Sequence, residues 1–237
     1  MTSKTLPLIE TAISWQGEGK FQGELCAFMR FKNCNLRCPF CDTLNRMDNL
    51  PEIEYSYEKL YDMIVTANNN MLITGGEPTM YNDQIVDFIK YVNERSTKEN
   101  RTIKTNFETN GYKLVELDNK LKNINWKDYD KCYYDFSPKN FHNDKARKET
   151  LRVIKEMHHL DPHFYIKLVG YDFKDNHKYL RKTLTEIRKD FPNLCIYLMP
   201  EGAISTEIMF NTRALLQVAD EFNCNFSSRL HIVHNFY

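Results

Sequence analysis

Short runs of apolar and β-branched residues recur along the 237-residue chain and predict a series of β-strands. From the second run onward, the starts lie about 30 residues apart, which is the length of one βα unit. The predicted strands are Leu25–Phe31, Met71–Thr74, Thr102–Glu108, Lys131–Phe136, His163–Val169, Leu194–Met199 and Leu230–Val233.

Segments with helical periodicity separate several of these strands. Apolar residues fall on one face of each predicted helix, spaced three or four residues apart or by multiples of that turn. The three clearest stripes are Ile85, Phe88, Ile89 and Val92; Leu180, Leu184, Ile187 and Phe191; and Ile208, Leu215, Ala219 and Phe222. Alternating strands and helices predict an α/β fold of parallel strands covered by helices.

Six βα repeats and a final strand are too few for an eight-fold barrel, so we expect a partial (βα)6-type, TIM-like barrel or a doubly wound sheet. In both architectures, chemistry gathers at the carboxyl ends of the strands. No linker rich in Gly, Pro or Ser interrupts the chain, which predicts one domain over residues 1–237. Thr43–Ser56 and Phe141–Lys145 are polar and are predicted as loops.

Composition narrows the class of protein further. The chain has 32 basic and 32 acidic side chains, so it has no global electrostatic reason to bind nucleic acid. No apolar run approaches the ~20 residues that span a bilayer, and the first residues lack the apolar core of a signal peptide. We therefore expect a cytoplasmic protein without a membrane or nucleic-acid partner.

Three of the seven cysteines, Cys34, Cys38 and Cys41, stand close together with the spacing C-x3-C-x2-C. Thiolates are soft ligands that suit iron–sulfur clusters or zinc. Three ligands would leave one iron of a four-iron cluster open to a substrate or cofactor. A zinc site completed by a distant Cys or His is the alternative. The other cysteines lie in or beside apolar runs and are predicted to be small core residues: Cys26, Cys132, Cys195 and Cys224.

The cysteine spacing, with Phe40 as the aromatic residue before the last cysteine, resembles the radical S-adenosylmethionine superfamily. The resemblance implies that Cys34, Cys38 and Cys41 bind a [4Fe–4S] cluster whose open iron chelates S-adenosylmethionine. One electron then cleaves the sulfonium and releases an adenosyl radical. Phe40 would lie by the adenine of this cofactor.

A second motif supports the resemblance. Thr74-Gly75-Gly76-Glu77-Pro78 directly follows a predicted strand and is similar to the family's GGEP motif. Glycines permit close backbone approach, and a carboxylate pairs with a cation, which suits the methionine ammonium. The resemblance assigns Thr74 to the substrate. It assigns further cofactor contacts to the ends of the next two strands, where Glu108 and then Ser137 and Lys139 stand.

The residues around the cysteines resemble the 7-carboxy-7-deazaguanine synthase family. Three features carry this likeness: the segment Ser14-Trp15-Gln16-Gly17-Glu18-Gly19, Arg30 on the first predicted strand, and Thr43 after Cys41-Asp42. The resemblance implies that the 14–19 segment reads a pterin ring, that Arg30 pairs with the substrate carboxylate, and that Thr43 coordinates Mg²⁺. Each role suits its residue type, because a guanidinium matches a carboxylate and Mg²⁺ prefers hard oxygens.

The end of the chain carries weaker signals. Ser228-Arg229-Leu230-His231 resembles the family's last strand, with His231 reaching the substrate, and the terminal carboxylate of Tyr237 is expected to meet the pterin. Met199 stands where the family pattern predicts glutamine, which changes one contact on the adenine side.

The resemblance as a whole implies a lyase. It would convert 6-carboxy-5,6,7,8-tetrahydropterin to 7-carboxy-7-deazaguanine, a step toward queuosine and other deazapurines, with loss of ammonia. The cofactors would be the cluster, S-adenosylmethionine and Mg²⁺, and the partners a reductant such as flavodoxin and a second copy in a homodimer. Two alternatives remain: a glycyl-radical activase, which has no need for Gln16–Gly19 or Thr43, and a non-catalytic metal-binding module, which has no use for Gly75–Pro78.

Overall fold

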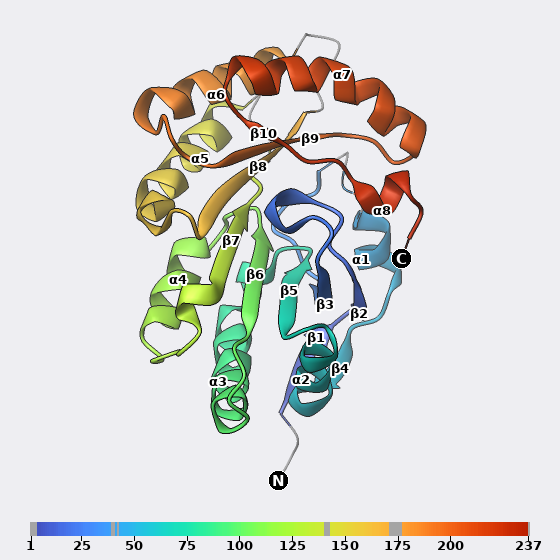
Figure 1. The fold of residues 1–237 in the computed structure, drawn as a ribbon, viewed down its shortest axis with the longest axis vertical. Coiled ribbons are helices and arrows are strands. Elements are labelled where there is room, and N and C mark those ends of the chain that lie inside the picture. Colours follow the sequence, from blue (N-terminus) through green and yellow to red (C-terminus); the bar gives the residue numbers. More distant parts are fainter. Residues whose placement is uncertain (1–3, 39–40, 42, 140–142, 171–176, 237) are drawn as a thin grey trace. The chain divides into compact units, whose positions relative to one another are not determined.

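The computed structural model describes residues 4–38, 41, 43–139, 143–170 and 177–236 (Figure 1). The chain forms two compact units. The first comprises Met1–Ser14 and Leu25–Tyr134, and the second comprises Trp15–Glu24 and Asp135–Tyr237. The chain thus enters the second unit twice, and strand β7 (Cys132–Phe136) runs from one unit into the other. The single-domain organisation stays a prediction.

The first unit is a mostly parallel sheet with covering helices. Its strands follow the order β2-β3-β5-β6-β7, and β3 to β5 and β5 to β6 are parallel pairs. The strands are β2 (Glu10–Trp15), β3 (Leu25–Phe31), β5 (Asn70–Gly75) and β6 (Lys104–Thr109), and the helices are α1 (Leu44–Asn49), α2 (Tyr57–Thr66), α3 (Asn82–Lys98) and α4 (Leu114–Lys122). A separate antiparallel pair joins β1 (Thr5–Leu8) to β4 (Ile53–Ser56).

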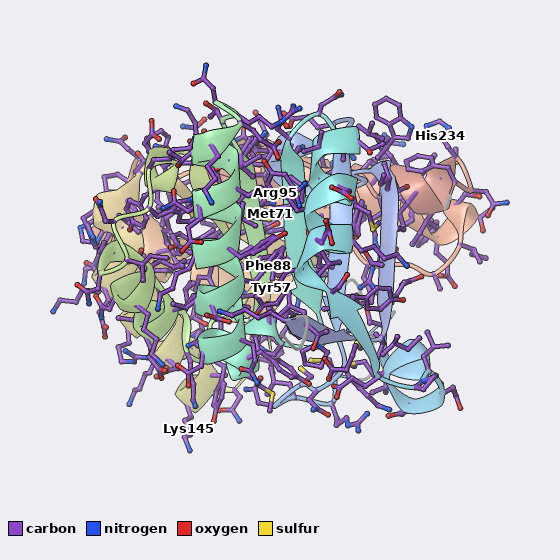
Figure 2. The ribbon with its side chains drawn as sticks, turned by 90° about the horizontal axis from the view of Figure 1, so that it is seen from below. Tyr57, Met71, Phe88, Arg95, Lys145 and His234 are labelled. Atoms are coloured by element: carbon purple, nitrogen blue, oxygen red, sulfur yellow. The ribbon has the colours of Figure 1, made fainter. Side chains whose placement is uncertain are left out.

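The core of the first unit lies where α2 and α3 pack on the sheet. Figure 2 shows Tyr57 of α2, Phe88 of α3 and Met71 of β5 close together, and all three are buried. The rings of Tyr57 and Phe88 meet edge to face with centroids 5.1 Å apart. The whole stripe Ile85, Phe88, Ile89 and Val92 is buried, which confirms the periodicity predicted for this helix.

The second unit repeats the same architecture. Its strands follow the order β7-β8-β9-β10, and β8 (Phe164–Gly170), β9 (Ile196–Pro200) and β10 (Asn225–Phe226) pair in parallel. Helices α5 (Asp144–Met157), α6 (Lys178–Asp190) and α7 (Ser205–Glu221) cover this sheet, followed by the short α8 (Leu230–Val233) (Figure 1). Every residue of β8 is buried. The predicted α/β class of parallel strands and helices is confirmed.

Four short 3₁₀ turns complete the described elements and mostly begin or end the longer ones: Gly19–Phe21, Pro78–Tyr81, Tyr129–Lys131 and His158–Leu160. Among the residues that the structure describes, no helix is long and apolar enough to cross a bilayer.

Three predictions about the elements are wrong. Leu230–Val233 is a helical turn instead of a strand, and the last strand is Asn225–Phe226; a four-residue apolar run fits either structure. Thr43–Ser56 contains α1 and β4, because Ile53–Ser56 finds a partner in β1 near the chain's start. In Phe141–Lys145, the described residues begin α5, where the Asn143 side chain accepts hydrogen bonds from two backbone amides.

Candidate functional site

The cysteine loop follows β3 in the first unit. Cys38 is buried, and Cys34 and Cys41 are partly buried. Burial raises the pKa of the Cys34 thiol. The backbone hydrogen bond from Leu36 opposes that effect, and the neighbouring Glu77, Cys38 and Cys41 add to it. Phe40 lies outside the described residues.

No three Cys, His, Asp or Glu side chains in the described part of the chain converge as ligands of a single metal ion. Thiolates are the soft ligands that iron–sulfur clusters take, so three cysteines on one loop are a donor set that fits such a cluster.

The turn after β5 packs directly against the chain that leads into the cysteine loop. Gly76 donates its backbone N–H to the Phe31 carbonyl at 2.9 Å, and Glu77 donates to the Asn33 carbonyl at 2.7 Å. Gly75 has φ +127°, and a Cβ there would lie 2.8 Å from the Phe31 Cα, with the Phe31 N and O closer still. At Gly76, a Cβ would lie 2.6 Å from the Asn33 carbonyl carbon. Glycine is thus required twice by this close backbone approach.

Glu77 is fully buried and holds the turn to the end of β6. Its Oε1 accepts from Thr79 N at 3.0 Å, Thr79 Oγ1 at 2.6 Å and Thr109 Oγ1 at 2.5 Å. Its Oε2 accepts from Asn110 N at 2.6 Å. Burial raises the pKa of Glu77, and these hydrogen bonds work against that rise. Pro78, at the start of the next 3₁₀ turn, is buried beside it.

Three predicted residues form one row across the sheet of the first unit. Arg30 and Thr74 are register partners on β3 and β5, and the Thr74 hydroxyl donates to Glu108 Oε2 at 3.0 Å. Arg30 also donates from Nη1 to Thr43 Oγ1 at 3.3 Å and from Nε to Glu10 Oε2 at 3.1 Å. The structure therefore brings Arg30, Thr74 and Glu108 together and places Thr43, whose side chain is buried, beside the guanidinium.

In the second unit, the Trp15–Glu24 segment is a closed loop. Gln16 N donates to the Glu24 carbonyl at 2.7 Å, and Gly23 N donates to the Gln16 carbonyl at 2.8 Å. The Gln16 side-chain oxygen accepts from Glu18 N at 3.2 Å. Gly17 packs on His231, since a Cβ at Gly17 would lie 2.9 Å from the His231 Cγ. The tip of the loop thus presents Glu18, while Trp15 is 53% exposed.

Glu18 is the centre of a charged cluster that we call the Glu18 network: Glu18, Asp135, Lys167, Arg229 and His231. Lys167 Nζ lies 2.9 Å from Glu18 Oε2 and 3.0 Å from Asp135 Oδ2. Arg229 Nε lies 3.0 Å from Glu18 Oε1, and His231 Nε2 lies 3.7 Å from the same oxygen. Burial alone would raise the pKa of Glu18, but Lys167, Arg229 and His231 together hold it far below its ordinary value.

Sequence reasoning identified Glu18 and His231 but missed the other members of the Glu18 network. Lys167 stands on a strand that is otherwise apolar, FYIKLVG, and a lysine there must be paired. That isolated charge was the available signal for Lys167.

The structure places the predicted residues Ser137 and Lys139 next to each other, with Lys139 Nζ donating to Ser137 Oγ at 2.7 Å. Tyr237 lies outside the described residues.

Residues 29–187 match the radical SAM superfamily, and the chain belongs to this family. The family implies a [4Fe–4S] cluster, S-adenosylmethionine and a reductant. The 7-carboxy-7-deazaguanine synthase of Hyperthermus butylicus is 27% identical over 238 residues, covering 96% of this chain and 92% of the relative. That of Methanocaldococcus jannaschii is 25% identical over 240 residues, covering 88% and 90%. The crystal structure of QueE from Escherichia coli superimposes with a TM-score of 0.62 at 19% identity, covering 96% and 95%.

Proposed function

We propose that this chain is a lyase that converts 6-carboxy-5,6,7,8-tetrahydropterin to 7-carboxy-7-deazaguanine and ammonia. The full-length likeness to enzymes named 7-carboxy-7-deazaguanine synthase supports this activity. One structural observation carries the proposal. Arg30, a carboxylate-binding cation, donates to the Thr43 hydroxyl at 3.3 Å, two residues after Cys41. A glycyl-radical activase has no need for Thr43, and a non-catalytic module has no use for Gly75–Pro78.

In this proposal, the first unit holds the redox cofactors. Cys34, Cys38 and Cys41 bind the cluster. The Gly75–Gly76 backbone, Glu77, Pro78 and Glu108 take the methionine and ribose side of S-adenosylmethionine. Ser137 and Lys139 stay predicted contacts to its carboxylate side. When bound, the cluster and S-adenosylmethionine supply the radical that removes hydrogen from C6 of the pterin. The fully buried Glu77 carboxylate holds the turn to the end of β6.

The Glu18 network recognises the pterin ring in this proposal. A pterin presents adjacent N–H donors, which a carboxylate accepts. Each oxygen of Glu18 has one cation within 3.0 Å, Lys167 on Oε2 and Arg229 on Oε1, and keeps acceptor capacity beyond it. Lys167 and Arg229 hold the carboxylate charged and fix its orientation, so it need not be reorganised when the ring binds. Gln16 and Gly17 shape the loop, His231 lies against Glu18, and Trp15 and Tyr237 stay predicted substrate contacts.

Thr43 is the proposed protein ligand of Mg²⁺. A hydroxyl is a hard oxygen, and Mg²⁺ keeps several waters while bridging a protein group and a substrate anion. Thr43→Ala is expected to lower turnover about tenfold and to flatten its dependence on Mg²⁺, because one ligand is lost. Turnover measured across a magnesium titration checks this. Thr43→Ser, which keeps the hydroxyl, is the matched control, and an unchanged magnesium response in Thr43→Ala would refute the assignment.

Arg30 is proposed to pair with the substrate carboxylate. Arg30→Ala is expected to raise the KM for the pterin about 10- to 100-fold, because a charged hydrogen bond contributes about 1.5–3 kcal/mol. The affinity for S-adenosylmethionine should stay close to that of the wild type. Kinetics with each ligand varied separately measure both quantities. Arg101→Ala, which removes a surface ion pair with Glu99, is the control. An equal loss of both affinities would argue against this role for Arg30.

The activity itself is tested with anaerobically reconstituted, reduced protein. The assay supplies S-adenosylmethionine, Mg²⁺ and the carboxytetrahydropterin, and mass spectrometry looks for a product lighter by one ammonia. Cleavage of S-adenosylmethionine without that product would keep the family chemistry and reject the substrate. Three further expectations stay predictions that this assay does not test: a flavodoxin-type reductant, a homodimer and a cytoplasmic location.

A further inference from the structure

Asn110 stands at the end of β6, directly after Thr109, and it touches both the Gly-Gly-Glu turn and the cysteine loop. Its backbone N–H donates to Glu77 Oε2 at 2.6 Å. Its side-chain amide nitrogen donates to Asn35 Oδ1 at 2.9 Å and lies 3.8 Å from Cys34 Sγ, within the range of an N–H···S hydrogen bond. Asn110 therefore joins the proposed cofactor turn to a proposed cluster ligand.

The orientation of the Asn110 amide is fixed by its partners. Its Oδ1 accepts from the Tyr112 backbone N–H at 3.1 Å, which leaves the NH₂ group to point toward Cys34 and Asn35. An amide turned the other way would set its oxygen against the Asn35 oxygen and lose the Tyr112 bond. Gly111 N donates to Thr109 Oγ1 at 2.9 Å, and Thr109 is itself bound to Glu77. The donor is thus held by the same buried carboxylate that holds the turn.

We propose that the Asn110 side-chain amide sets the reduction potential of the cluster through its hydrogen bond to the Cys34 thiolate. Hydrogen bonds to cluster sulfurs are one of the levers that tune iron–sulfur potentials. An N–H dipole aimed at the sulfur stabilises the more negative, reduced cluster and raises its potential. The backbone amide of Leu36, 3.4 Å from the same sulfur, is a second donor that no side-chain change removes. Asn110 is the donor whose removal changes the potential without altering a cluster ligand.

The inference rests on membership of the family and is independent of the pterin reaction. The test therefore omits both the pterin and S-adenosylmethionine. The midpoint potential is measured by redox titration, with the reduced cluster followed by electron paramagnetic resonance. Asn110→Ala removes the donor, and Asn110→Asp removes it and adds a negative charge at nearly the same shape. We expect the potential to fall in the order wild type, Asn110→Ala, Asn110→Asp.

For Asn110→Ala, we expect the ratio of reduced to oxidised cluster at a fixed solution potential to fall about tenfold. This corresponds to a midpoint potential about 59 mV lower for a one-electron couple. Asn93→Asp is the matched control, since it makes the same substitution on α3, where Asn93 accepts from Lys127 N. Asn110→Gln keeps an amide donor and should restore part of the shift.

Three outcomes would overturn the proposal. The first is an Asn110→Ala potential equal to that of the wild type. The second is a shift in Asn93→Asp as large as that in Asn110→Asp, because the effect would then be one of net charge. The third is loss of the cluster from both Asn110→Ala and Asn110→Asp, which would make Asn110 a requirement for cluster assembly instead of a tuning group. Since none of these readouts involves turnover, they are separate from a failure of the proposed lyase activity.

Discussion

Lys167→Met is expected to abolish efficient use of the pterin while leaving the cysteine loop intact. Lys167 bridges Glu18 and Asp135 at 2.9 and 3.0 Å, and its side chain is only 5% exposed. Removing it leaves two buried carboxylates with one fewer cation, which costs about 3 kcal/mol or more of unfolding free energy. Without Lys167, Glu18 is no longer held charged and oriented for the ring, and losing about 2 kcal/mol of this preorganisation lowers the affinity for the pterin about 30-fold.

The measurements are urea unfolding, the KM for the pterin and iron content. Lys182→Met is the control, because Lys182 is half exposed and lies 3.9 Å from an exposed Asp144 carboxylate. An exposed pair contributes no more than about 1 kcal/mol. Lys167→Arg should recover part of the affinity. The role assigned to Lys167 fails if Lys167→Met binds the pterin as the wild type does, or unfolds at the same urea concentration as Lys182→Met.

The stability difference between the wild type and Lys167→Met is expected to depend on pH. Because the pKa of Glu18 is lowered in the folded protein, the stability it contributes is present above its ordinary pKa of 4.5. That stability is lost as the pH falls through the lower, folded pKa. The gap in unfolding free energy between the wild type and Lys167→Met should therefore be constant from pH 7 to about pH 5.5 and narrow only at more acidic pH. A gap that widens below pH 5 would contradict the charge pairing.

The residues of the site that stand at the ends of successive strands could be predicted from the sequence. The contacts between segments far apart in the sequence could not. The row of Arg30, Thr74 and Glu108 follows from strand ends that align in a parallel sheet, so each position could be read from its own strand. Lys167 and Arg229 reach Glu18 across 149 and 211 residues of sequence. A spacing pattern carries no information on such pairs.

Errors at the two polar stretches and at the chain's end have a related physical origin. Ile53–Ser56 is a strand because β1, some 50 residues earlier, offers it a hydrogen-bonding edge. The four residues Leu230–Val233 are too few for periodicity to separate a strand from a helical turn. There, the Leu230 amide donates to the Gly17 carbonyl at 3.0 Å, and the bonds that follow are local. Tertiary partners decided both structures.

Gly75→Ala is expected to have the second large effect, on the cluster and on stability together. The backbone of Gly75 has φ +127°, a conformation that L residues avoid, and an added Cβ would collide with the backbone of Phe31. Backbone strain of this kind costs about 1–3 kcal/mol, and the clash adds to it because backbone atoms of a central strand cannot move aside cheaply. The total loss of unfolding free energy should exceed about 3 kcal/mol.

The loss should reach the cluster, because the chain pushed away is the one that leads to Cys34. Gly76 and Glu77 donate to Phe31 and Asn33 at 2.9 and 2.7 Å, so separating the two strands breaks both bonds and displaces the loop. Iron content after reconstitution and urea unfolding of the unreconstituted protein measure the two effects separately. Gly23→Ala is the matched control, since Gly23 has φ +89° but no atom within 4 Å of the added Cβ. Gly23→Ala should lose only the unfolding free energy that backbone strain costs, and it should keep its full iron content. If Gly75→Ala loses no more stability than Gly23→Ala and keeps its iron, close packing of the turn against the cysteine loop is not what positions the cluster.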